Sequence, residues 1–134
     1  MITGINHITF SAADLNASIL FYRDLLGMKL HVVWDSGAYL TAGDTWLCLS
    51  LGAPEPARDY THVAFNVSDS QLSALRVRLQ QAGIEEWKRN TSEGDSVYIL
   101  DPNGHRLELH CGTLETRLAK LRSTPYAGLV WCET

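Results

Sequence analysis

Apolar and polar residues alternate along much of this chain in short runs, which turn residues such as Gly, Asp and Asn separate. Alternation with a period of two is typical of half-buried β-strands. The pattern predicts strands over Ile5–Ala12, Lys29–Asp35, Ala38–Thr41, Trp46–Leu51, Thr61–Val67, Glu86–Lys88, Ser96–Leu100 and Arg106–Cys111. Helical spacing of apolar residues predicts helices over 14–26, Asp69–Gln81 and Leu114–Arg122.

The order strand, helix and three strands occurs twice. His62 lies 55 residues after His7, and Gly83, which closes the second helix, lies 56 residues after Gly27, which closes the first. Because order, spacing and residue type agree, we interpret the chain as a duplication of the α+β class. Two βαβββ modules are expected over about 1–52 and 59–112, and a helix and tail at 113–134 complete a single domain over 1–134.

Charge and cysteine content narrow the classes of partner. The net charge is -4, from 11 basic and 15 acidic side chains, and no run of Lys or Arg is present to bind nucleic acid. No stretch approaches the roughly 20 apolar residues that a membrane-spanning helix requires. The three cysteines form no CxxC pair, and an odd count without a signal peptide fits a reducing cytoplasm.

Strand alternation places several reactive side chains on one face. His7 and Thr9 share a face of the first strand, away from the apolar residues, while His62 occupies the equivalent place on the fifth strand. On the fourth and eighth strands, Leu47, Leu49, Leu51, Leu107 and Leu109 are expected to pack, while Trp46, Cys48, Ser50, Arg106, Glu108 and His110 face the other way.

These faces predict a metal site. The repeat relates His7 to His62 and puts Cys48 near the position that matches Glu108. Two imidazoles and one carboxylate on one side of a divalent ion leave positions open for substrate, a set that suits iron(II), manganese(II), zinc or nickel. The competing interpretation is a solvated or core-satisfied histidine on each strand, which would be preferred for a single strand histidine but less so for a matched pair.

The chain resembles the vicinal oxygen chelate superfamily, and within it the fosfomycin-resistance thiol transferases of the glutathione type. The resemblance runs over nearly the whole chain. It is carried by NHITF near the start, WDSGAYL (34–40), WLCLS (46–50), DYTH (59–62), WKRNTSEGDSVY (87–98), LDPNGHRLELH (100–110) and PYAG (125–128). The run from Trp87 to Tyr98 is the most specific of these pieces.

The resemblance implies conjugation of glutathione to the epoxide of fosfomycin, with manganese(II) and an activating potassium ion. Matching metal positions are His7, His62 and Glu108, and matching potassium positions are Asn90, Ser92, Gly94 and Ser96. The phosphonate positions are Thr9, Lys88, Ser92, Tyr98 and Arg117, and Trp46 and Cys48 are expected to line the same pocket. The thiol positions are Trp34, Tyr39, Ser50 and Tyr126, with Thr9 and Tyr39 as catalytic residues.

The family also implies a cupped mixed sheet around the metal cleft and a homodimer. We therefore expect His7 to come from one subunit and His62 with Glu108 from the other. His110, on the face of Glu108, is expected to support that ligand, while His31 and His105 are not expected to be ligands. Two alternatives stay open: a related enzyme that adds another thiol or water to an epoxide, and a metal-free drug-binding protein of the same fold.

Overall fold

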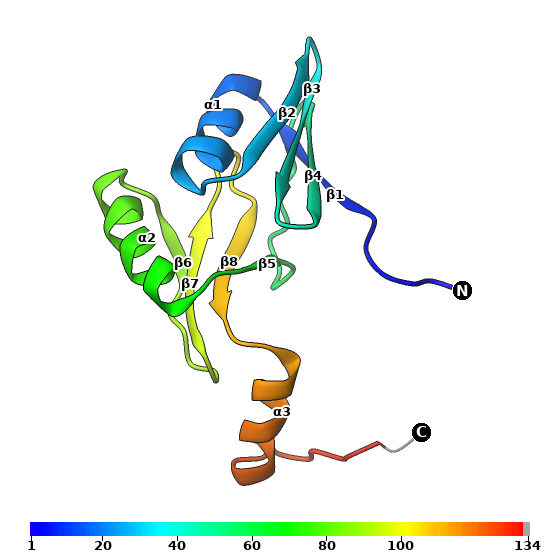
Figure 1. Ribbon diagram of the computed structural model, residues 1–134, viewed down its shortest axis with the longest axis vertical. Helices are drawn as coiled ribbons and strands as arrows, with labels where there is room; N and C mark the ends of the chain where they lie inside the picture. The colour runs from blue at the N-terminus through cyan, green and yellow to red at the C-terminus, as the bar shows by residue number, and fades with distance from the viewer. Residues whose placement is uncertain (133–134) are drawn as a thin grey trace.

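The computed structural model describes residues 1–132, so the last two residues of the predicted tail, 133–134, lie outside the described residues. The first module contains β1 (His7–Ala12), α1 (Leu15–Ile19), a π-helical continuation η1 (Leu20–Leu25), β2 (Lys29–Trp34), β3 (Gly37–Ala42) and β4 (Thr45–Leu51). The second contains β5 (Val63–Asn66), α2 (Asp69–Gln81), β6 (Glu86–Lys88), β7 (Asp95–Leu100) and β8 (Arg106–Cys111), before α3 (Leu114–Ser123). Figure 1 shows α1 and α2 on the same side of the molecule, and α3 beyond the end of β8.

Each module forms its own four-stranded sheet, and the two sheets have the same topology. Their strand orders are β1-β4-β3-β2 and β5-β8-β7-β6. In each, the first strand pairs in parallel with the last, and the remaining pairs are antiparallel. The predicted pair of βαβββ modules in an α+β fold is confirmed.

The helices begin at polar caps and pack their apolar residues on the sheets. Asp14 accepts a hydrogen bond from the backbone N–H of Ala17, and Ser68 accepts one from Gln71, so each satisfies a free amide of the first turn. The bounds predicted for the second helix agree with those of α2. The first helix instead widens in η1, where the Leu26 N–H bonds to the carbonyl of Phe21.

The core lies between the sheets and their helices. Leu40, Leu47, Ile99 and Leu107 are fully buried there, in agreement with the alternation. The prediction that Leu51 packs in the core is wrong, because its side chain stays 47% exposed at the end of β4. Among residues 1–132, none of the helices has the length and apolarity that crossing a bilayer takes.

A buried polar contact fixes the second module on the first. The Tyr22 hydroxyl donates to Asp101 Oδ2 at 2.7 Å, and both residues are buried. Burial, and then the negative charge of Asp101, raise the pKa of Tyr22 well above its ordinary value, so the phenol stays a donor. Asn103 donates to Ser18 Oγ at 3.0 Å across the same junction. The turn before β8 thereby sets how the two modules lie against each other.

His105 lies at the same junction. Its Nε2 lies 2.8 Å from the Ser11 carbonyl, and its ring stacks on Phe10 at 5.1 Å between centroids. His31 is also occupied elsewhere, with Nε2 2.7 Å from Thr41 Oγ1 on the neighbouring strand. These contacts tie the two histidines to the strands of the first module.

Candidate metal centre and substrate site

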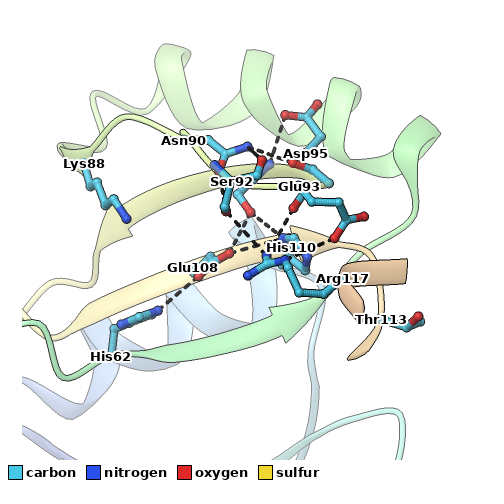
Figure 2. Close-up of polar contacts among 12 residues, drawn as sticks. His62, Lys88, Asn90, Ser92, Glu93, Asp95, Glu108, His110, Thr113 and Arg117 are labelled. Carbon is cyan, nitrogen blue, oxygen red and sulfur yellow. Dashed lines mark hydrogen bonds and ion pairs between the residues drawn. The ribbon is translucent and has the colours of Figure 1, made fainter. Parts of the chain in front are cut away.

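Two of the three predicted metal ligands face each other on the second module. Nε2 of His62, just before β5, lies 3.0 Å from Oε1 of Glu108, which β8 holds almost buried (Figure 2). Nδ1 of His62 lies 2.7 Å from the Tyr60 carbonyl, which can only accept, so this nitrogen carries the proton. Nε2 and Oε1 are then two electron-pair donors in contact, an arrangement that a divalent cation satisfies. The donor set therefore fits a metal.

The other carboxylate oxygen of Glu108 is held from the protein side. The Ser96 hydroxyl donates to Oε2 at 2.6 Å, and Nδ1 of His110 lies 2.5 Å from the same hydroxyl and 3.3 Å from Oε2. A Cβ added at Gly94 or Gly112 would come within 2.7 Å of the His110 ring. The absence of a Cβ at the two glycines therefore lets the His110 ring lie close to Glu108. The carboxylate is thus oriented by the protein itself, without a bound ligand.

Aromatic rings form a wall beside these ligands. Trp87 and Tyr98 pack edge to face at 5.2 Å, and the Trp87 ring lies 5.4 Å from that of His62. Lys88 is paired with Tyr98 in the β6–β7 register and places Nζ 4.9 Å from the centre of its ring. Burial, and then the charge of Glu108, raise the pKa of Tyr98, which keeps its hydroxyl a hydrogen-bond donor.

The loop between β6 and β7 is organised by Asn90. Its Nδ2 donates to the Gly94 carbonyl at 2.8 Å, while its Oδ1 accepts from the N–H and the hydroxyl of Ser92 at 3.2 Å and 3.1 Å. The loop is also tied from outside, because Nη2 of Arg76 on α2 donates to Asp95 Oδ1 at 2.5 Å. Three of the four predicted potassium residues thus lie in one folded loop rich in oxygen atoms, and the fourth, Ser96, follows in β7.

Replacing Gly94 tests how tightly this loop is seated. Gly94 has φ of +79°, and a Cβ there would approach the Cys111 carbonyl oxygen to 2.5 Å. We expect Gly94→Ala to lower the free energy of unfolding through backbone strain and, in addition, through overpacking. The overpacking part should be roughly 1–3 kcal/mol. The measurement is denaturant unfolding of Gly94→Ala, of a matched control variant and of wild type.

Gly83→Ala is the matched control. Gly83 has φ of +69°, and a Cβ there would have nothing within 4 Å, so that variant carries the strain without the contact. Equal losses in the two variants would contradict a tightly packed loop.

Arg117 reaches the same loop from the first turns of α3. Its Nη2 donates to Ser92 Oγ at 3.4 Å and to the Glu93 carbonyl at 3.1 Å, while Nε pairs with the Glu93 carboxylate at 3.2 Å (Figure 2). The helix begins at Thr113, whose hydroxyl accepts from the Thr116 N–H. Two residues predicted to bind substrate, Ser92 and Arg117, are therefore in contact.

The predicted residues of the first module gather on one face of its sheet. His7 lies against Trp46 with ring centroids 4.5 Å apart, Trp46 meets Tyr39 at 5.1 Å, and Tyr39 meets Trp34 at 4.8 Å. Trp34 and Tyr39 remain 43% and 37% exposed, so a large aromatic surface is left open. His7 is exposed, and its Nδ1 lies 2.7 Å from Asn6 Oδ1.

Three more predicted residues share this face. Thr9, Cys48 and Tyr39 are direct neighbours across β1, β4 and β3. Ser50 lies two residues after Cys48 on β4 and is exposed, whereas Cys48 is buried. Tyr126 lies after α3 in the C-terminal tail and is 55% exposed. The thiol and phosphonate residues predicted on the first module thus belong to the strands that carry His7 and its aromatic neighbours.

Within one chain these residues form two half-sites. His7 and His62 both border a cavity of about 1240 Å³ between the modules. Nevertheless, residues 1–132 contain no group of three His, Cys, Asp or Glu side chains placed to hold one metal ion. His62 and Glu108 come together, and His7 stands apart from them.

Sequence reasoning missed two residues of the second half-site. Glu93, which pairs with Arg117, belongs to a loop with no periodic pattern, so nothing in the sequence indicated its partner. Tyr60 precedes β5 in an irregular linker, and only its position two residues before His62 hinted at a role. The contact of His110 with Glu108 could be anticipated, because alternate residues of one strand share a face.

Comparison with known families and relatives agrees with this geometry. Residues 4–109 match the model of the glyoxalase/bleomycin resistance protein/dioxygenase superfamily. The glutathione transferase FosA of Serratia marcescens is 49% identical over 98% of this chain and 96% of its own length. The metallothiol transferase FosB of Shouchella clausii is 39% identical over 92% of this chain and 90% of its own length.

Solved structures of fosfomycin resistance proteins have a similar fold. The fosfomycin resistance protein FosX of Listeria monocytogenes, in complex with Mn(II) and sulfate, superimposes with a TM-score of 0.79 at 31% identity, over 90% of this chain and 98% of that one. A variant of that protein, in complex with Mn(II) and a dihydroxypropylphosphonic acid, gives a TM-score of 0.77 at 30% identity, over 89% and 99% of the two chains.

Proposed function

Because this chain belongs to the glyoxalase/bleomycin resistance protein/dioxygenase superfamily, we propose that it is a metal-dependent transferase that conjugates glutathione to the epoxide of fosfomycin. The observation that carries this proposal is likeness to a glutathione transferase FosA over nearly the whole chain. The facing pair of His62 and Glu108 supports the requirement for metal.

His62 and Glu108 would hold the metal, with His7 of the partner subunit as the third ligand. A divalent ion bound there supplies a Lewis acid that stabilises negative charge on the opening epoxide oxygen. Manganese(II) is our first choice, since the related FosX has been solved with it. The hydroxyl of Ser96 and the ring of His110 keep Glu108 oriented for this task.

Cations and hydroxyls of the second half-site would bind the phosphonate. Lys88 and Arg117 supply positive charge, and Ser92 and Tyr98 supply hydroxyl donors on the same side of the sheet as Glu108. Thr9 of the first module, beside His7, would complete the set from the partner subunit. The substrate is thus held at its charged end while its epoxide is left open to attack.

Glutathione would approach over the aromatic face of the first module. Trp34, Tyr39 and Ser50 on that face, together with Tyr126 of the C-terminal tail, form our proposed thiol site, and the Tyr39 hydroxyl orients the sulfur. The sulfur forms a bond to an epoxide carbon while that carbon's bond to oxygen breaks. The thiol releases one proton, and the epoxide oxygen takes up one proton to become a hydroxyl. The residues mainly position the reactants, because epoxide opening needs correct alignment more than acid–base catalysis.

Three further features belong to the proposal. The loop that Asn90 organises would bind potassium through Asn90, Ser92, Gly94 and Ser96, since carbonyl and hydroxyl oxygens suit a large monovalent cation. A homodimer would bring the two half-sites together across subunits. The cytoplasm, where glutathione is abundant and thiols stay reduced, is the compartment that we propose.

A second candidate function is addition of water to the same epoxide. The likeness to FosX structures favours it, one of which holds a dihydroxypropylphosphonic acid. Such a reaction would require a carboxylate beside the substrate to activate water. Ser36–Tyr39 contains no Glu, and the nearby Asp35 is an exposed residue of the turn between β2 and β3. We therefore prefer the thiol.

A product assay tests the proposal. Purified protein is incubated with fosfomycin, manganese(II) and potassium, and the nucleophile is glutathione, bacillithiol, cysteine or water alone. We expect the glutathione adduct to form fastest. A diol without any thiol adduct would transfer the assignment to the hydrolase reaction. Tight fosfomycin binding by metal-free protein without any product would favour a drug-binding protein.

A further inference from the structure

The side chain of Tyr60, in the linker before β5, contacts the second half-site. Its hydroxyl accepts a hydrogen bond from Nζ of Lys88, and the centre of its ring lies 4.5 Å from the same nitrogen. The ring also packs edge to face on His62 at 4.9 Å and on Trp87 at 5.9 Å. Tyr60 therefore joins the aromatic wall from the linker side.

Together with Tyr98, this residue holds the ammonium group of Lys88 between two rings. The distances from Nζ to the ring centres are 4.5 Å for Tyr60 and 4.9 Å for Tyr98, both within the range of cation–π contacts. The hydrogen bond to Tyr60 is also the largest cause that raises the pKa of Lys88, so the group stays charged. A lysine side chain otherwise loses much rotamer freedom when it binds an anion.

The linker turn that carries Tyr60 is itself fixed. Asp59 Oδ1 accepts from the Thr61 N–H at 2.9 Å, and a guanidinium N–H of Arg106 donates to the Asp59 carbonyl at 2.5 Å. The Tyr60 carbonyl accepts from Nδ1 of His62 at 2.7 Å. The backbone carbonyl of Tyr60 thus contacts the metal ligand His62, while its hydroxyl contacts Lys88. A substitution that removes only the hydroxyl leaves the carbonyl contact in place.

We propose that Tyr60 is a positioning residue for the phosphonate: its hydroxyl and ring hold the Lys88 ammonium group ready beside the metal ligands. The proposal rests on the proposed function, in which Lys88 binds the phosphonate of fosfomycin. Figure 2 shows the Lys88 side chain directed toward Glu108, on the side of the sheet where the substrate would lie. Tyr60 acts through Lys88 and does not itself contact the reacting atoms.

A double-mutant cycle tests this proposal, with Tyr60→Phe, Lys88→Met and the double variant compared with wild type. Tyr60→Phe removes only the hydroxyl, and Tyr60 is 55% exposed, so the fold should persist. We expect the KM for fosfomycin to rise about tenfold, the lower end for loss of a hydrogen bond to a charged group, with kcat within about twofold of wild type. Bound manganese per chain should not change.

The Lys88→Met background gives the decisive comparison. There, Tyr60→Phe should change KM by less than about twofold, because the group it positions is gone. An unchanged KM in Tyr60→Phe, an undiminished tenfold effect in the Lys88→Met background, or loss of manganese would overturn the proposal.

Calorimetric binding of fosfomycin to the same four manganese-loaded proteins separates this proposal from the catalytic one. If wild type forms no adduct but binds fosfomycin, the proposed function fails, and the cycle in Kd still tests Tyr60 with the same expected ratios. If wild type forms the adduct while Tyr60→Phe keeps the wild-type Kd and KM, only the role of Tyr60 fails. A wild-type protein that binds no fosfomycin overturns both.

Discussion

Glu108→Gln is expected to abolish both adduct formation and manganese retention while leaving the fold intact. Glutamine has the same shape, and its amide oxygen can still accept from the Ser96 hydroxyl, so the buried contact at 2.6 Å has a replacement. What is lost is the negative charge opposite His62. A Lewis acid contributes several kcal/mol to such a reaction, so its loss should lower kcat/KM by roughly a thousandfold.

The measurements are kcat/KM for fosfomycin, metal content after purification without chelator, and thermal unfolding. Glu55→Gln is the control, because Glu55 is an exposed carboxylate of the linker. It should match wild type in all three measurements. An active, manganese-loaded Glu108→Gln protein would exclude Glu108 as a ligand.

His7→Gln is expected to lower kcat/KM by at least about a hundredfold, again because the Lewis acid is weakened or lost. The environment of His7 within its own chain would instead suggest only a small effect on activity. The side chain is exposed, contacts Asn6 and Trp46, and belongs to no three-ligand group among residues 1–132. A large effect on activity with little effect on unfolding would therefore show that His7 has a functional role which its contacts within its own chain do not explain.

His31→Gln provides the matched control for this variant. His31 is also an exposed strand histidine with one side-chain partner, Thr41 Oγ1 at 2.7 Å, and should tolerate the change. Assays of both variants across a range of manganese concentrations would separate weakened metal binding from loss of fold. Wild-type activity in His7→Gln would remove His7 from the ligand set.

The sequence was sufficient for features that depend on strand periodicity. Alternation alone places Glu108 on one face of β8 with His110, and the repeat alone matches His7 with His62. The period of two is a local property of the backbone, so it survives whatever the strands pack against. Polar caps and terminal glycines likewise gave the bounds of α2.

Other features depend on tertiary contacts that no period records. Leu51 follows the alternation of β4, yet it lies at the strand end, where its side chain stays 47% exposed. The π-helical turn after Ile19 has no counterpart in the apolar spacing, and the pairing of Glu93 with Arg117 joins residues 24 positions apart in the chain. Tyr60 belongs to a linker, where sequence predicts only irregular backbone. A side chain in such a segment gains its role from the strands that it meets.

The central claim is that one metal site takes His7 from one subunit and His62 with Glu108 from the other. The most direct test is the mixed dimer of a His7→Gln chain with a Glu108→Gln chain, purified through a different tag on each. If ligands cross between subunits, one site carries both defects and the other is intact, so the twofold dimer should recover about half of wild-type activity. If each chain supplied all its own ligands, both sites would be defective and the mixed dimer would be as inactive as either parent.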